Sequence, residues 1–190
     1  MSESQDPFVP LTPPVDQRDH AIGPPDAPVT LVEYGDYECP YCGRAFPIVD
    51  RLRQEVGERL RLVFRHFPQN TVHAHASVAA QAAEAAAAQG KFWEMHEKLY
   101  RHQDDLADAD LVQYALRLGL EVYRFESDLA SEQFSRKVRD DFSSGLRSGV
   151  KGTPTFFING VRYDGPLEYE ALREAIIRAE STLSSPSAHS

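Results

Sequence analysis

The chain has 190 residues, of which 42% are hydrophobic and 26% charged, and its formal net charge is -9. This composition is typical of a globular protein with one well-buried core. The negative charge argues against nucleic acid or an anionic membrane as a partner, since both need clustered Lys and Arg. The N-terminal sequence lacks the basic start and apolar run of a secretory signal, so we expect a cytoplasmic protein, or an exported one if a leader was removed.

The first part of the chain predicts an extended lead-in followed by strand, helix and strand. Residues 1–28 contain seven prolines, whose fixed φ and missing N–H groups favour a mobile, extended segment. β-branched residues at 29–34 predict a strand, and apolar residues spaced three and four apart predict a helix from Pro40 to Gly57. A second strand is predicted at 59–67. A strand–helix–strand unit of this length implies two parallel strands.

The middle of the chain predicts helices, and its end predicts a hairpin and a closing helix. Helices are expected at 76–90, 91–102, 108–120 and 127–149, with Asp108 or Asp110 as the N-cap of the third. Residues 155–159 predict a strand, and the Asn-Gly pair at 159–160 predicts a tight turn into an antiparallel partner. We therefore expect an α/β protein with a lead-in (1–26), a βαβ half (27–71), an all-helical insertion (72–149), a ββα half (150–181) and a disordered tail (182–190).

The only two cysteines, Cys39 and Cys42, are separated by Pro40 and Tyr41 at the predicted start of a helix. Pro40 suits the first helical position, so Cys39 is expected at the N-cap. Free backbone N–H groups and the helix dipole there favour a thiolate, and cysteines in such positions reach pKa values of roughly 3.5–7.5. We expect Cys39 to be the more exposed, attacking thiol and Cys42 the inner, resolving thiol.

A zinc site is the main alternative for the cysteine pair. Zinc takes four ligands, and the pair supplies two, so His66, His73 and His75 are candidates for the others. The sequence has no second CxxC, and Pro40 is typical of a redox turn. We therefore favour a redox pair and expect no metal there.

Three carboxylates precede the pair. Asp36 and Glu38 are expected to face solvent and to moderate the lowering of the thiol pKa without cancelling it. Glu33 lies on the same strand face as Val29 and Leu31, a face that a parallel sheet would bury. For Glu33 a functional role and a solvated carboxylate at the strand end both remain open.

A second motif, "GTPTFF", covers residues 152–157 and places Pro154 at the start of a strand. Most X–Pro bonds are trans, and Pro154 alone would be expected to follow them. Together, however, "YGDYECPYCGRAFP" and "VKGTPTFFING" resemble the thioredoxin superfamily and, within it, the DsbA-like thiol–disulfide oxidoreductases. The resemblance extends over residues 27–180 and implies a thioredoxin fold with a helical insertion between its two halves.

The resemblance implies a role for each residue that matches the motifs. Cys39 would be the nucleophile, and Cys42 its partner in a redox disulfide. Pro154 would be cis and lie beside that disulfide, while Thr153 would offer backbone groups to an extended substrate chain. Glu33 would be the buried acid that helps proton transfer to the resolving thiol.

The dipeptide Pro40-Tyr41 departs from the Pro-His of the periplasmic oxidants and is glutaredoxin-like, which leaves the direction of electron flow open. We expect a monomeric dithiol–disulfide oxidoreductase that acts on protein or peptide thiols without a cofactor. A redox partner protein, or glutathione as co-substrate, would recycle it. Two alternatives are a glutathione-coupled, glutaredoxin-like reductase and a peptide-binding or chaperone-like module whose thiols take no part.

Overall fold

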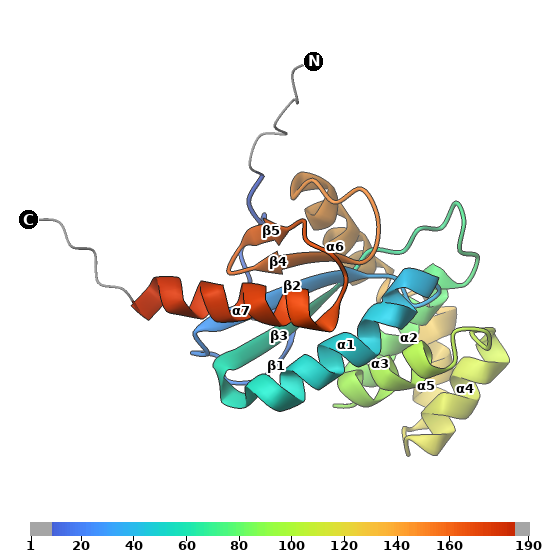
Figure 1. Cartoon of the computed structure of the whole chain (residues 1–190). Helices are drawn as coiled ribbons and strands as arrows, with labels where there is room; N and C mark the ends of the chain where they lie inside the picture. Colours follow the sequence, from blue (N-terminus) through green and yellow to red (C-terminus); the bar gives the residue numbers. More distant parts are fainter. Residues whose placement is uncertain (1–8, 185–190) are drawn as a thin grey trace, which may run out of the picture.

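The computed structural model describes residues 9–184, which form a five-stranded sheet covered by helices (Figure 1). The sheet order is β1-β3-β2-β4-β5. The strands are β1 (His20–Ile22), β2 (Val29–Gly35), β3 (Leu60–His66), β4 (Thr155–Ile158) and β5 (Val161–Tyr163). β2 and β3 are parallel, and the pairs β1–β3, β2–β4 and β4–β5 are antiparallel. The predicted parallel pair and C-terminal hairpin are confirmed.

The helices lie on both faces of the sheet and in a lobe beside it. They are α1 (Pro40–Val56), α2 (Ala76–Ala87), α3 (Phe92–Arg101), α4 (Asp108–Arg117), α5 (Val122–Ala130), α6 (Ser135–Arg147) and α7 (Tyr169–Ser184), with a short 3-10 turn η1 (Gly57–Arg59). Helices α1 and α7 pack on one face, where Leu31 of β2 meets Leu52 and Leu172. Helix α6 packs on the other face, where Val32 and Phe157 lie. Alternate residues of β2 therefore enter two separate cores, as the period of a strand requires.

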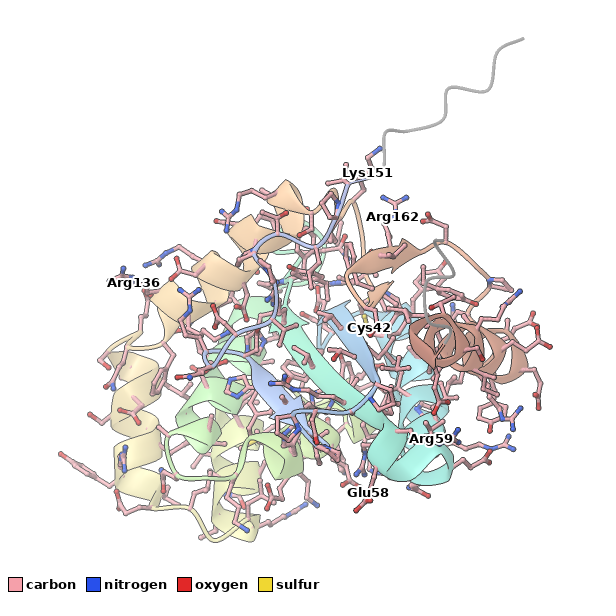
Figure 2. All side chains as sticks on the ribbon, turned by 90° about the vertical axis from the view of Figure 1, so that its left-hand side faces the viewer. Cys42, Glu58, Arg59, Arg136, Lys151 and Arg162 are labelled. Carbon is pink, nitrogen blue, oxygen red and sulfur yellow. The ribbon has the colours of Figure 1, made fainter. Side chains whose placement is uncertain are left out.

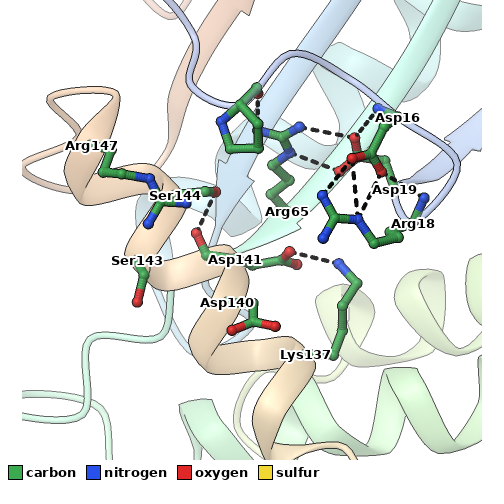
Figure 3. Close-up of a pocket in the computed structure, with 11 residues that line it drawn as sticks. Asp16, Arg18, Asp19, Arg65, Lys137, Asp140, Asp141, Ser143, Ser144 and Arg147 are labelled. Carbon is green, nitrogen blue, oxygen red and sulfur yellow. Dashed lines mark hydrogen bonds and ion pairs between the residues drawn. The ribbon is translucent and has the colours of Figure 1, made fainter.

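The lead-in is extended, as predicted, but its described part is held to the sheet. The N–H of Leu11 donates to the carbonyl of Gly160 at 3.0 Å, and the Leu11 side chain is buried. The buried guanidinium of Arg65 donates to the Asp19 carboxylate at 2.7 and 2.9 Å and to the carbonyl of Pro13 (Figure 3). The short strand β1 follows, which the sequence did not predict because three residues carry no alternation. Residues 1–8 and 185–190 of the predicted mobile ends lie outside the described residues.

Two details of the helical insertion differ from the prediction. The single helix expected at 127–149 is two helices, since α5 ends at Ala130 and Glu132 has a positive φ of 49° before α6 begins. Neither Asp108 nor Asp110 is the N-cap of α4. That position is Ala107, whose N–H donates to the Asp110 carboxylate at 3.2 Å, so the acid stabilises the helix start from inside the first turn.

Candidate active site at the start of α1

The turn that joins β2 to α1 carries both cysteines. Cys39 is the N-cap of α1 and Pro40 its first residue, as predicted from the proline. The N–H of Cys39 donates to the carbonyl of Asp36 at 3.1 Å, and the carbonyl of Cys39 accepts the N–H of Gly43 at 3.0 Å. The expected difference in exposure is small, because Cys39 is 3% and Cys42 0% exposed. Figure 2 shows Cys42 in the interior, whereas Lys151 and Arg162 lie at the periphery.

The cis-proline segment lies against the first thiol. The peptide bond between Thr153 and Pro154 is cis, and the Thr153 carbonyl oxygen is 3.4 Å from Cys39 Sγ. The Thr153 hydroxyl accepts a hydrogen bond of 2.7 Å from the side-chain amide of Gln69. The Thr153 side chain also hydrogen-bonds to Cys39 and lowers the pKa of that thiol. The fold thus brings two motifs that are 114 residues apart into contact.

Asp36 connects the cysteine turn to the loop after β3. We expected it to face solvent, but its side chain is fully buried. Its carboxylate accepts the N–H of Glu38 at 2.9 Å, the N–H of Gln69 at 2.8 Å and the Nδ1–H of His73 at 2.7 Å. Buried carboxylates need such donors, so local polarity is a poor guide to exposure here. Asp36 therefore fixes Gln69, which in turn holds Thr153.

Glu38, the second acid expected in solvent, is also engaged. Its carboxylate accepts the backbone N–H of His75 at 2.6 Å and contacts the His75 ring at 3.1 Å. Its side chain is partly buried, at 23% exposed. Both acids thus tie the cysteine turn to residues 69–75, and the order of the turn depends on contacts that are distant in sequence.

The two thiols have opposite electrostatic surroundings. A hydrogen bond from the Cys42 thiol is the largest cause that lowers the pKa of Cys39, to about 5. The Thr153 side chain and the backbone of Cys42 and Tyr41 lower the pKa further, while burial opposes them. Burial raises the pKa of Cys42, and its hydrogen bond to Cys39 and the nearby Glu33 add to this. At neutral pH Cys39 is therefore a thiolate and Cys42 a thiol. The hydrogen bond from Cys42 lowers the pKa of Cys39 more than the backbone groups at the helix start do.

Glu33 lies beneath the cysteine pair in an apolar setting. It is 3% exposed, which rules out a solvated carboxylate, and its Oε1 has no hydrogen-bond partner among residues 9–184. Burial, and then the charge of Cys39, raise the pKa of Glu33 to about 8. It lines a cavity of about 140 Å³ between α1 and α3, together with Phe46, Trp93 and His96. Glu33 is therefore protonated at neutral pH and close enough to the thiols to respond to their charge.

Tyr41 and the cis-proline segment line a surface cleft of about 440 Å³. Tyr41 is 59% exposed, and the Arg44 guanidinium lies 4.3 Å from the centre of its ring. Residues 162–165, at the end of β5 and directly after it, also line the cleft. Thr153 and Pro154 also line the cleft, and the Thr153 carbonyl oxygen, 3.4 Å from Cys39 Sγ, brings it close to the first thiol.

A larger cleft of about 730 Å³ adjoins the first one at Lys151. Residues 67–71, which follow β3, form one wall, and α6 forms the other. Its lining is mainly apolar on the α6 side, with Val138, Phe142 and Leu146. Lys151 lines both clefts, whereas Thr153 and Pro154 line the smaller one.

The histidines proposed as zinc ligands do not gather at the cysteines. His73 binds Asp36, His75 binds Glu38, and His66 binds Glu84 at 2.7 Å. Within residues 9–184, no group of three or more candidate metal ligands contains a cysteine. One such group exists elsewhere and consists of His20, His66 and Glu84. The sequence analysis missed it, although Glu84 is the single carboxylate of an alanine-rich helix.

The sequence and the fold of this chain are similar to those of known proteins. The sequence pattern of the thioredoxin family matches residues 16–178. The chain belongs to the thioredoxin family. A thioredoxin-like oxidoreductase from Silicibacter pomeroyi superposes with a TM-score of 0.77 at 29% identity, over 87% of this chain and 94% of that one. The α-DsbA1 of Wolbachia pipientis superposes with a TM-score of 0.75 at 19% identity, over 88% and 94%. The thioredoxin fold of the DsbA type is thus confirmed.

A sequence relative is a Na⁺/H⁺ antiporter, NhaA 3 of Salinispora tropica. The two sequences are 50% identical over 173 residues, which cover 90% of this chain and 26% of the antiporter. The chain thus spans about a quarter of the length of the curated relatives it matches. In the part of this chain that the structure describes, no helix is long and apolar enough to cross a membrane.

Proposed function

We propose that the protein is a dithiol–disulfide oxidoreductase that exchanges disulfides with protein or peptide substrates through Cys39 and Cys42. The observation that carries the proposal is the asymmetry of the pair, in which the pKa of Cys39 is lowered to about 5 and that of Cys42 is raised. A stable thiolate is both the attacking group and the better leaving group in thiol–disulfide exchange. The buried thiol is retained for the second step.

The exchange balances without a cofactor. In the direction of substrate oxidation, a substrate thiolate attacks Sγ of Cys39 in the disulfide, and the sulfur of Cys42 leaves with the electron pair and takes up a proton. A second substrate thiolate then attacks the substrate sulfur of the mixed disulfide and expels Cys39 as a thiolate. The substrate loses two electrons, and the cysteine pair gains them. Reduction of a substrate is the reverse sequence.

Glu33 is proposed as the group that exchanges a proton with Cys42. The electrostatic effects between these groups indicate that Glu33 lies close to the cysteine pair. The charge of Cys39 raises the pKa of Glu33, and the charge of Glu33 raises the pKa of Cys42. A carboxyl group with a pKa of about 8 can donate and accept protons near neutral pH. The adjoining cavity gives this proton a path that avoids the apolar core.

Thr153 and Pro154 are proposed as the backbone surface on which the substrate chain lies. The smaller cleft, which both residues line, and the larger cleft that adjoins it at Lys151 support an extended peptide along this segment, with its sulfur directed at Cys39. Tyr41, exposed at the mouth of the smaller cleft, is placed to contact the residues beside the substrate cysteine.

The proposal is tested with a Cys42→Ser variant, in which the mixed disulfide cannot be resolved. Incubated with a peptide disulfide, this variant is expected to accumulate a covalent adduct at Cys39, detected by intact-mass and peptide mapping. Cys39→Ser is the matched control and should form none. The proposal is refuted if wild-type protein shows no Cys39–Cys42 redox transition across a glutathione titration. If both variants still bind the peptide and the wild type shows no redox transition, the result would support the redox-silent binding module.

The Cys42→Ser variant also distinguishes glutathione from membrane proteins as the reaction partner. Turnover that depends on glutathione, with a Cys39–glutathione adduct in Cys42→Ser, would support recycling in the glutaredoxin manner. The identity with part of Na⁺/H⁺ antiporters favours a second, more specific candidate, a membrane transport protein as the thiol substrate. For it, the Cys42→Ser variant should capture a transporter from solubilised membranes as a disulfide that dithiothreitol releases. Capture of only small peptides and glutathione would contradict this candidate.

A further inference from the structure

Three side chains from separate elements converge away from the cysteine pair, and we call them the His–Glu cluster. His20 lies on β1, His66 ends β3, and Glu84 belongs to α2. Nε2 of each histidine lies 2.7 Å from the same atom, Oε1 of Glu84. The three potential ligand atoms lie within 4.8 Å of one another. His66 and Glu84 are buried, and the His20 side chain is 18% exposed.

We propose that the His–Glu cluster binds a divalent transition-metal ion, with Zn²⁺ as the representative. Two imidazoles and one carboxylate are a donor set that zinc uses in proteins, with a fourth position left open for water. Calcium and magnesium are poor candidates because they require mainly oxygen ligands in greater number. The site would be separate from the redox reaction and takes no part in the steps described above.

The two nitrogen–oxygen separations require only a small adjustment. With zinc–ligand distances of roughly 2.0–2.2 Å, a tetrahedral ion holds each nitrogen about 3.3 Å from the carboxylate oxygen. The present separations of 2.7 Å must therefore open by about half an ångström, which a rotation of the Glu84 or His20 side chain provides. His20 lies on an edge strand and is partly exposed, so it is the ligand that can move and the side from which water can enter.

Aromatic rings hold the two imidazoles in place. The His20 ring stacks on Phe92 with centroids 3.6 Å apart, and His66 meets the rings of Phe64 and Phe92 edge-on at 5.4 and 6.1 Å. Such an apolar shell limits solvent access and keeps ligands oriented. The cluster resembles a prepared site in this respect, because the histidines keep their positions through packing as well as through Glu84.

Metal binding would join β1 to the helical insertion. The lead-in ends in β1, an edge strand whose pairing partner in the described sheet is β3, and Glu84 lies on a helix of the lobe. An ion that binds the folded state and not the unfolded one stabilises the fold by mass action. We therefore expect added Zn²⁺ to raise the melting temperature. We also expect it to increase the protection of backbone amides from hydrogen exchange, most of all at residues 20–22.

The test uses the oxidised protein, in which the Cys39–Cys42 disulfide removes both thiols as ligands. Protein stripped with a chelator is titrated with Zn²⁺ by calorimetry, and one ion per chain is expected. Glu84→Gln preserves the size and one acceptor oxygen and should lower the affinity at least tenfold, as loss of even supporting groups does. Glu97→Gln, an exposed residue paired with Arg101, is the matched control and should bind as wild type.

His20→Asn is the second variant, and X-ray absorption of the zinc-loaded wild type requires no variant at all. The expected spectrum has only nitrogen and oxygen ligands, two of them imidazoles. The proposal is overturned if the oxidised wild type binds no Zn²⁺, if the variants bind as tightly as the wild type, or if the spectrum lacks imidazole. In those cases the cluster is a hydrogen-bonded pin between β1 and α2, and the proposed redox function is unaffected.

Discussion

Two buried acids lie within six residues of Cys39, and their surroundings are opposite. Asp36 has its carboxylate surrounded by donors from Glu38, Gln69 and His73. Glu33 has an oxygen without a partner among the described residues, beside the cavity between α1 and α3. The difference separates two roles, since a satisfied carboxylate fixes geometry, whereas an unsatisfied one holds a proton near neutral pH.

The largest expected effect comes from Asp36→Asn. The amide cannot accept from all three donors and turns its own N–H₂ toward one of them. We expect the free energy of unfolding to fall by about 3 kcal/mol, as for other broken buried polar networks. Urea unfolding measures it, with Asp140→Asn, an exposed acid, expected to change stability by less than about 0.5 kcal/mol. An equal effect of the two variants would contradict the structural role of Asp36.

Glu33→Gln should affect the chemistry more than the fold. Without its exchangeable proton, the step in which Cys42 resolves the mixed disulfide should slow roughly 10²-fold, measured by stopped-flow mixing. The folded pKa of Glu33 is raised from 4.5 to about 8, so the wild type binds more protons when folded and loses stability as pH rises through this window. The variant should lack that decline. A normal rate with an unchanged pH profile would refute the proton role.

The thiolate of Cys39 should titrate with a midpoint near pH 5, followed by thiolate absorbance or by alkylation rate. Because folding lowers this pKa, the thiolate stabilises the reduced, folded protein above the ordinary thiol value of 9.0, and this contribution is lost as pH falls toward 5. Thr153→Val removes the hydroxyl and should raise the midpoint by about one pH unit, or about 1.4 kcal/mol. Thr155→Val, whose hydroxyl binds Gly152, is the control.

The smallest effect is expected from Tyr41→His. A cationic imidazole near Cys39 favours the thiolate, but the exposure of position 41 lets solvent screen it. We expect the reduction potential to rise by about 20 mV, or about 1 kcal/mol for two electrons. The wild-type potential should lie above the roughly -270 mV of thioredoxin, since the low pKa of Cys39 stabilises the reduced pair. A fall on substitution would show that Tyr41 itself supports the thiolate.

The elements that were predicted correctly are those whose structure depends on the residues of a single short segment. Pro40 alone placed Cys39 at the helix start, and the Asn159-Gly160 pair, both with positive φ, predicted the final hairpin. Strand β2 followed from its β-branched and aromatic residues, and β3 from an alternating pattern that becomes an apolar run. These features depend on neighbours within a few positions, and such neighbours are visible in a single sequence.

The parts that were missed depend on partners far along the chain. Asp36 is buried because Gln69 and His73, 33 and 37 residues later, supply its donors. Strand β1 has three residues and exists because β3 offers its edge. The break at Glu132 has another cause, a positive φ that glutamate rarely adopts and that its residue type does not predict. The role of Glu84 was missed because it contacts His20, which lies 64 residues away in the sequence.

The contact between Cys39 and Thr153 also has a consequence for synthesis. The 114 residues between them take on the order of 10 s to translate at typical rates of roughly 5–20 residues per second. During that interval the nascent chain carries its cysteines without the Thr153 side chain that helps to stabilise the thiolate. The cysteine pair therefore acquires its full reactivity toward other chains only after the segment that contains Thr153 has been synthesised and has folded against it.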